Sequence, residues 1–270
     1  MDGVIIRELQ AMPELYALVE MQQAIWGMSP AEATSPYLMN AAIHNGGVVL
    51  GAEHGGQLVG FCFGFAARRG AEWLLWSHMA GVLPAFHEHG IGLKLKLAQR
   101  LWALEHGYPV IGWTIDPLQR GNANFNFRRL GVTASVYYVN HYGEMTDAIN
   151  AGLASDRLEV RWTLMDERVA ACAAGHPPAE TALPGETAAL LLSAGAGQAL
   201  LLAPETAFER PVCFVEIPYQ VNALKHDDLE LARRWQLALR WAMQEALRRG
   251  YMIVDFVSQE QRGWYVLQRP

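Results

Sequence analysis

Apolar residues in the first part of the chain follow two different periods, and these periods predict strands and helices in turn. Short apolar runs at 4–9 and 48–53 are typical of strands, whereas 12–26 repeats apolar residues at helical spacing. The glycines within 54–57 supply the positive φ that a tight turn needs, so we expect an antiparallel hairpin around them.

A long apolar run at 73–83 predicts a strand in the middle of this region. A glycine-bearing loop follows it, then a leucine-rich helix at 90–105 and a strand at 110–115. Because a helix separates the two strands, we expect them to be parallel neighbours joined by a crossover. The pattern further predicts a short helix at 122–130 and strands at 135–139 and 158–164.

The composition changes after Leu164. The segment 171–197 is rich in Ala, Gly and Pro, which predicts a linker followed by a weakly specified hairpin. Further on, the pattern predicts a strand at 212–217, a long helix at 227–249, and strands at 252–257 and 264–267.

A helix that ends in Gly-Tyr before an apolar strand occurs in both halves, at Gly107-Tyr108 and Gly250-Tyr251. This leaves open a partial internal duplication. We predict an α/β protein with a first domain at 1–165, a linker and hairpin at 166–210, and a smaller C-terminal α/β domain at 211–270.

Charge and cysteine content narrow the function classes. The 270 residues carry a formal net charge of −6 and no basic stripe, which argues against a nucleic-acid partner. The three cysteines lie far apart and match no metal or redox spacing, so we expect reduced core thiols. The N-terminus lacks the pattern of a signal peptide and no apolar run could cross a bilayer, so we expect a cytoplasmic protein without a membrane partner.

The loop after the strand at 73–83 reads Val82-Leu83-Pro84-Ala85-Phe86-His87-Glu88-His89-Gly90-Ile91-Gly92. Between a strand and a helix, such a loop points backbone N–H groups and the positive end of a helix dipole at one spot, which suits a phosphate. An ordinary turn is the alternative, since glycines serve turns everywhere. Lys94 and Lys96 follow closely, and either one could reach a phosphate or lie on a solvated helix face.

With the order of the predicted elements, this loop resembles the GNAT superfamily of acyl-CoA-dependent N-acyltransferases. The resemblance rests on Val82-x-Pro84 and on Gly90-x-Gly92, and it covers about the first 165 residues. It implies a mixed, largely antiparallel sheet with helices on both faces. It also implies that the loop binds the pyrophosphate of a coenzyme A thioester. The cofactor-binding residues that we predict are Val82, His87, Glu88, His89, Gly90, Ile91, Gly92, Asn122 and Asn126.

Two positions depart from the family pattern. His87 stands where the family has Arg or Gln, which lowers the expected affinity without abolishing backbone binding. Phe127 stands at the family's frequent general acid, a tyrosine that protonates the leaving thiolate, and a phenyl ring cannot donate a proton. Tyr137 and Tyr138 on the next strand are the nearest replacements in sequence.

The amine that attacks a thioester needs a base, because an ammonium group has no free lone pair. By the period of two, His78 shares a strand face with Ala80 and Val82, which directs it toward the expected site; a histidine satisfied by a backbone carbonyl is the alternative. Asp116 is a further candidate at a strand end, or else a strand-ending cap. The predicted catalytic set is therefore His78, Tyr138 and Asp116.

Asn122 and Asn126 could bond the cofactor or merely cap their short helix. The cluster His87-Glu88-His89 cannot converge on a metal without a distant third ligand, so we expect no metal.

The resemblance implies transfer of an acetyl or succinyl group to a primary amine of a small molecule such as an amino acid, by direct attack. A succinyl donor would need a cation for its carboxylate, which Arg120, Arg128 or Arg129 could supply. The alternative is a non-catalytic acyl-CoA sensor or scaffold, which His87 and Phe127 favour. For the C-terminal part three roles stay open: a second GNAT-like half, a cover over the acceptor site, or a homodimer interface.

Overall fold

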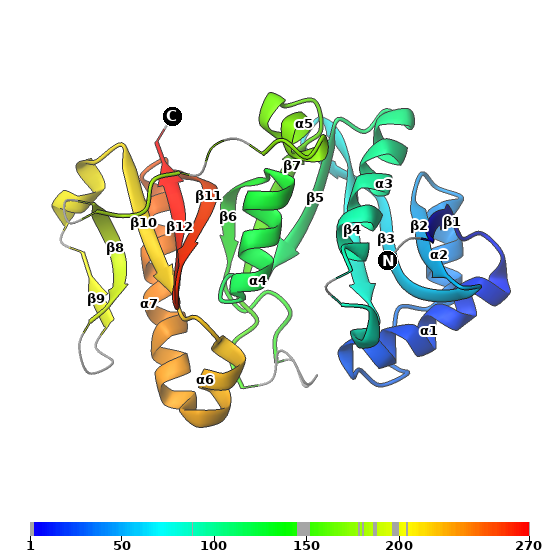
Figure 1. Cartoon of the computed structure of the whole chain (residues 1–270), viewed down its shortest axis with the longest axis horizontal. Coiled ribbons are helices and arrows are strands. Elements are labelled where there is room, and N and C mark those ends of the chain that lie inside the picture. The colour runs from blue at the N-terminus through cyan, green and yellow to red at the C-terminus, as the bar shows by residue number, and fades with distance from the viewer. Residues whose placement is uncertain are drawn as a thin grey trace. The chain divides into compact units, whose positions relative to one another are not determined.

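The computed structural model describes residues 3–87, 89–144, 152–177, 179, 181–185, 188–195, 200–203 and 205–269 (Figure 1). The described chain divides into two compact units, one up to Trp113 and one from Thr114 onward. The boundaries predicted at 165 and 210 stay predictions.

The first unit is built on strands in the order β1-β2-β3-β4-β5. Neighbours are antiparallel except β4 and β5, which pair in parallel at Leu75↔Ile111 and Trp76↔Gly112. The predicted crossover between parallel strands is therefore confirmed. The strands are β1 (Val4–Glu8), β2 (Val48–His54), β3 (Gln57–Arg69), β4 (Glu72–Val82) and β5 (Val110–Ile115), the last of which runs across the boundary between the units.

Helices cover both faces of these strands, because side chains along β3 alternate in direction. Phe61 and Phe63 pack in a core with α1 (Met12–Trp26) and α2 (Pro36–Ile43). Cys62 points the other way, and its Sγ lies 3.9 Å from the Leu95 carbonyl oxygen of α3 (Ile91–Glu105). The expected position of α3 between β4 and β5 in the chain is confirmed.

The sequence pattern missed α2. Ser35 caps this helix by accepting a hydrogen bond from the Tyr37 N–H, and Pro36 occupies its first turn. A serine before a proline is a helix-start signal that a search for apolar periodicity overlooks, since the helix has only eight residues.

The second unit contains strands in the order β7-β6-β11-β12-β10-β8-β9. All described neighbours are antiparallel except β10 and β8. The strands on either side of the helix that ends in Gly-Tyr are arranged differently in the two units. In the second unit β12 lies between β10 and β11, whereas β4 and β5 pair directly in the first unit. The strands are β6 (Thr133–Tyr138), β7 (Arg157–Thr163), β8 (Ala189–Ala194), β9 (Leu200–Leu202), β10 (Val212–Ile217), β11 (Met252–Gln259) and β12 (Arg262–Gln268).

Helical segments of the second unit correct several predictions. The short helix expected at 122–130 consists of α4 (Arg120–Ala123) and a π-helix, η2 (Asn124–Leu130). The segment expected to begin as a linker contains the end of α5 (Glu167–Ala173), which Asp166 caps. The hairpin expected after it is present as β8 and β9. The other helices are η4 (Glu205–Glu209), α6 (Val221–Asp227) and α7 (Leu229–Arg248).

The predicted mixed α/β class with largely antiparallel strands is confirmed. The three cysteines are buried and free of disulfides. In the part of the chain that the structure describes, no helix combines the length and apolar character needed to cross a membrane.

Candidate functional site

His78 lies in a β-bulge, and this changes the direction in which it points. Phe63 pairs with Met79 and Gly64 with Ser77, so His78 is an extra residue of β4 at this point of the ladder. An extra residue breaks the period of two. The expectation that His78 shares a face with Ala80 and Val82 is therefore wrong.

The His78 ring lies on the face that α1 and α2 cover. Its centroid is 5.9 Å from that of Phe63 and 5.7 Å from that of Phe65, and both of these rings belong to the core under those helices. Desolvation lowers the pKa of His78 below its ordinary value, although part of the residue is exposed. The neutral imidazole that this favours at neutral pH is the form that accepts a proton.

The glycine loop ends in an open helix start. A short 3₁₀ turn, η1 (Pro84–Phe86), leads to His87, whose Nε2 lies 2.9 Å from the Val82 carbonyl oxygen. Gly90 has a φ of 71°, and no side chain caps α3 there. A Cβ added at Gly90 or Gly92 would meet nothing within 4 Å. The start of α3 therefore has no side-chain cap and has open space beside both glycines, as a phosphate cradle requires.

Of the other predicted cofactor contacts in this loop, His89 is exposed and Ile91 is buried, so Ile91 could contribute only through its backbone. Glu88 lies outside the described residues.

Beyond Trp76, β4 pairs with β3 alone among the described residues, because its ladder with β5 consists of the two pairs given above. The edge of β4 turned away from β3 thus carries main-chain groups outside any described ladder. Backbone N–H groups along such an edge are the kind of donor that polarises a carbonyl group.

Lys96 occupies neither of the environments expected for it. Its Nζ donates hydrogen bonds to Ser77 Oγ and Gln99 Oε1, both at 3.0 Å, and lies 3.6 Å from the centre of the Trp113 ring. Burial lowers the pKa of Lys96 to about 7. Lys94 is exposed, so it is the lysine that can approach a ligand at the loop.

A signal for the burial of Lys96 was present in the sequence. Lys96, Gln99 and Ala103 are spaced three and four residues apart, which places them on one helix stripe, and all three are buried. A search for apolar periodicity does not detect this stripe, because two of its three members are polar.

The remaining predicted site residues belong to the second unit. Asp116 Oδ1 accepts a hydrogen bond from the Leu118 N–H at 2.9 Å, which is the geometry of a strand-ending cap. Burial raises the pKa of Asp116 above its ordinary value. The Tyr138 hydroxyl donates to Glu159 Oε2 at 2.7 Å, and its ring stacks on His141.

The two predicted asparagines bond each other, since Asn126 Nδ2 donates to the Asn122 carbonyl oxygen at 2.8 Å. Asn126 is buried and Asn122 is exposed. Within the described ranges, no group of three His, Cys, Asp or Glu side chains is placed to hold a metal.

Phe127 is a core residue of the second unit. It is fully buried and meets Tyr265 edge to face, with the ring centroids 5.6 Å apart.

Installing the family's tyrosine by Phe127→Tyr should lower the free energy of unfolding by about 1–3 kcal/mol, because the new hydroxyl is buried without a prepared partner. Urea unfolding measures the change. Phe65→Tyr, at a half-buried ring, is the control and should cost less; equal stability of Phe127→Tyr and wild type would contradict the prediction.

No family model and no curated protein matches the sequence. Solved structures do match. One is an acetyltransferase of the GNAT family from Streptococcus pneumoniae, at 13% identity and a TM-score of 0.46, covering 59% of this chain and 98% of its own. The chain is similar to the GNAT family of acetyltransferases.

Two further solved structures match part of this chain. The ribosomal-protein-S18-alanine N-acetyltransferase from Escherichia coli matches at 14% identity and a TM-score of 0.46, over 60% of this chain and 94% of its own. Arabidopsis thaliana Naa50, in complex with the bisubstrate analogue CoA-Ac-MVNAL, matches at 15% identity and a TM-score of 0.46, over 59% and 97%.

Proposed function

We propose that this protein is an acyl-CoA-dependent N-acyltransferase that acylates a primary amine of a small molecule such as an amino acid. The observation that carries the proposal is the start of α3: an uncapped helix N-terminus at Gly90, directly after the bulged strand β4, with open space at both glycines. In this proposal the backbone of the loop binds the pyrophosphate of coenzyme A, and Lys94 adds a cation.

Acyl transfer from a thioester to an amine requires two proton transfers and the polarisation of the thioester carbonyl. The attacking ammonium group has to lose a proton, and the neutral imidazole of His78 is the proposed acceptor, from the face of β4 that α1 and α2 cover. The thioester carbonyl has to be polarised, for which backbone N–H groups along the β4 edge are proposed. The leaving thiolate has to gain a proton, for which Tyr138 is the proposed donor, since Phe127 has none to give. Asp116 stays the alternative candidate for the base.

The choice between an acetyl and a succinyl donor depends on a cation near the acyl end. Arg128 Nη1 lies 4.0 Å from Asp255 Oδ2, and the Arg120 guanidinium lies 4.2 Å from the centre of the Tyr219 ring. Both are thus engaged within the second unit, which leaves the exposed Arg129 as the better candidate for a succinyl carboxylate. A cytoplasmic location and a homodimer stay predictions.

The function is tested in two stages with the full chain. A thermal-shift panel with coenzyme A, acetyl-CoA and succinyl-CoA should show a raised Tm for at least one of them, because a ligand of the folded state stabilises it. Thiol release in the presence of pooled amino acids should then reveal turnover. The absence of any shift would overturn the proposal, whereas a shift without thiol release would favour the non-catalytic sensor.

Gly90→Val should weaken binding of the stabilising thioester by about tenfold or more. The φ of 71° is strained for a β-branched residue, so the loop has to change its backbone where it meets the ligand. Gly107→Val is the matched control, because Gly107 also has a positive φ of 78° and open space around it, but lies after the other end of α3. Titration calorimetry should show the loss for Gly90→Val alone, and equal losses in the two variants would argue against the loop.

A further inference from the structure

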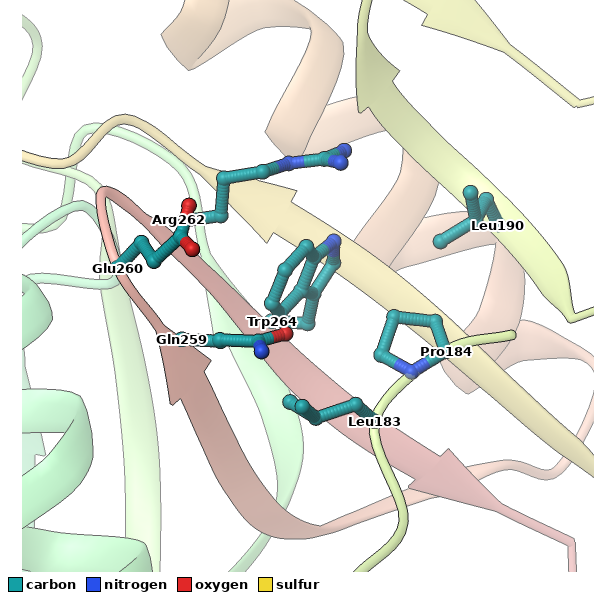
Figure 2. A pocket seen from close by; sticks show the side chains of 7 residues that line it. All are labelled: Leu183, Pro184, Leu190, Gln259, Glu260, Arg262 and Trp264. Atoms are coloured by element: carbon teal, nitrogen blue, oxygen red, sulfur yellow. The ribbon is translucent and has the colours of Figure 1, made fainter. Parts of the chain in front are cut away.

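The second unit has a hollow of its own, separate from the glycine loop. It has a volume of about 230 Å³ and opens beside the turn between β11 and β12 (Figure 2). The residues that line it are Leu183, Pro184, Leu190, Gln259, Glu260, Arg262 and Trp264.

Arg262 brings a cation to this hollow in a fixed orientation. Its Nε and Nη2 donate to the two carboxylate oxygens of Glu216 at 2.9 and 2.7 Å, and Glu216 is almost fully buried. The guanidinium also lies 4.8 Å from the centre of the Trp264 ring. Half of the Arg262 side chain is exposed, and its Nη1 has no partner among the described residues. Two N–H groups of a preorganised guanidinium are thus available to an acceptor.

Trp264 adds a second donor. The residue is 4% exposed, and no described group accepts a hydrogen bond from its buried Nε1–H. Figure 2 shows the nitrogen on the edge of the indole that is turned toward Arg262 and Leu190. An unsatisfied buried donor favours any ligand that brings an acceptor to it. The nitrogen is covered by its neighbours, so such a ligand has to part the side chains over this edge.

The other walls set the size and the character of the ligand. Leu183, Pro184 and Leu190 supply apolar surface, and the Gln259 amide reaches in beneath the indole (Figure 2). The volume lies below the range of about 300–1,000 Å³ that is usual for drug-sized ligands. Glu260 also lines the hollow, but Figure 2 shows its carboxylate beside the aliphatic stem of Arg262, on the side away from the guanidinium. An anionic end at the guanidinium and an apolar end at the three apolar side chains therefore suit the hollow.

We propose that this hollow is a binding site for a small apolar carboxylate, whose carboxylate oxygens accept hydrogen bonds from Arg262 Nη1 and Trp264 Nε1 while its aliphatic body packs against Leu183, Pro184 and Leu190. A free carboxylic acid and an apolar amino acid share this chemistry. Nothing in the proposal depends on acyl transfer.

The test uses the full chain and three probes of similar size: isocaproate, its neutral analogue isocaproamide, and leucine. We expect isocaproate to bind at least about tenfold more tightly than the amide in titration calorimetry, because only the carboxylate meets the cation with full charge. Isocaproate should also move one indole N–H signal in the NMR spectrum, the signal that Trp264→Phe removes. Leucine distinguishes an amino-acid ligand from a free carboxylic acid, since leucine binds as tightly as isocaproate only if the site also accepts an ammonium group.

Two variants and two controls complete the test. Trp264→Phe keeps an aromatic side chain, although a smaller one, and loses the N–H donor. The double variant Glu216→Gln, Arg262→Gln replaces the ion pair by two neutral amides without orphaning a buried carboxylate. Each should weaken isocaproate binding by about tenfold or more, whereas Trp73→Phe and Arg233→Gln, at exposed positions, should not change it. Equal affinity for acid and amide, no binding of either, or unchanged affinity in a folded Trp264→Phe protein would overturn the proposal.

Discussion

A Lys96→Met variant should lose most of the pH dependence of stability that the wild-type chain shows between about pH 7 and pH 10.5, the folded and unfolded pKa values of Lys96. The side chain is buried against Ser77, Gln99 and Trp113, and burial lowers its pKa to about 7. The folded state therefore releases the proton at a lower pH than the unfolded state does.

The sign of the effect follows from proton binding. Below about pH 7 both states carry the proton, and the full cost of burying the ammonium group opposes folding. Between about 7 and 10.5 the unfolded state binds more protons, so wild-type stability rises with pH. At about 1.4 kcal/mol per pH unit, the gain over this window is about 3–5 kcal/mol.

Urea unfolding of both proteins at a series of pH values measures the effect, because the difference between them isolates Lys96 from the other titrating groups. Lys94→Met is the matched control: this lysine is two positions away on the same helix and is exposed, so its removal should leave the slope unchanged. A Lys96→Met protein with the wild-type slope would contradict the burial argument.

The sequence pattern predicts correctly the elements whose conformation depends mainly on residues close together in the chain. The hairpin of β2 and β3 follows from glycines that supply positive φ, and α3 follows from leucines at helical spacing. The bulge at His78 could not be predicted in this way, because it depends on how β4 pairs with β3 and not on the residues of β4 alone. One inserted residue was enough to turn the candidate base to the opposite face.

The residues of the candidate site differ in how well the sequence predicts their surroundings. The loop around Gly90 is local, and its open helix start agrees with the sequence pattern. The burial of Lys96 is not predicted by the pattern, because the two environments expected for it, a bound phosphate and solvent, both lie outside the core, whereas its side chain contacts Ser77 of β4. For Asn126 the sequence leaves cofactor binding and helix capping open, and in the structure its amide donates to the preceding turn of the helix, a competition that spacing does not reveal.

Asp156→Asn should lower the free energy of unfolding by about 3–5 kcal/mol, since removal of one partner from a buried ion pair leaves the other charge uncompensated. Asp156 is 2% exposed, and its two oxygens accept from Arg240 Nε at 2.8 Å and Nη2 at 2.9 Å. The Tyr137 hydroxyl and the Asn140 N–H donate to the same carboxylate at 2.8 and 3.0 Å. The carboxylate thus joins β6, the segment after it, and α7 within the second unit.

A second substitution separates the lost charge pair from a general failure to fold. Adding Arg240→Met to Asp156→Asn should restore part of the stability, because it removes the orphaned guanidinium and leaves an apolar side chain in its place. Glu230→Gln is the control: its partner Arg233 is on the same helix as Arg240, but both side chains are more than half exposed, so the change should stay below about 1 kcal/mol. If the double variant were no more stable than Asp156→Asn alone, the destabilisation would come from the lost hydrogen bonds of Tyr137 and Asn140 and not from the unpaired charge of Arg240.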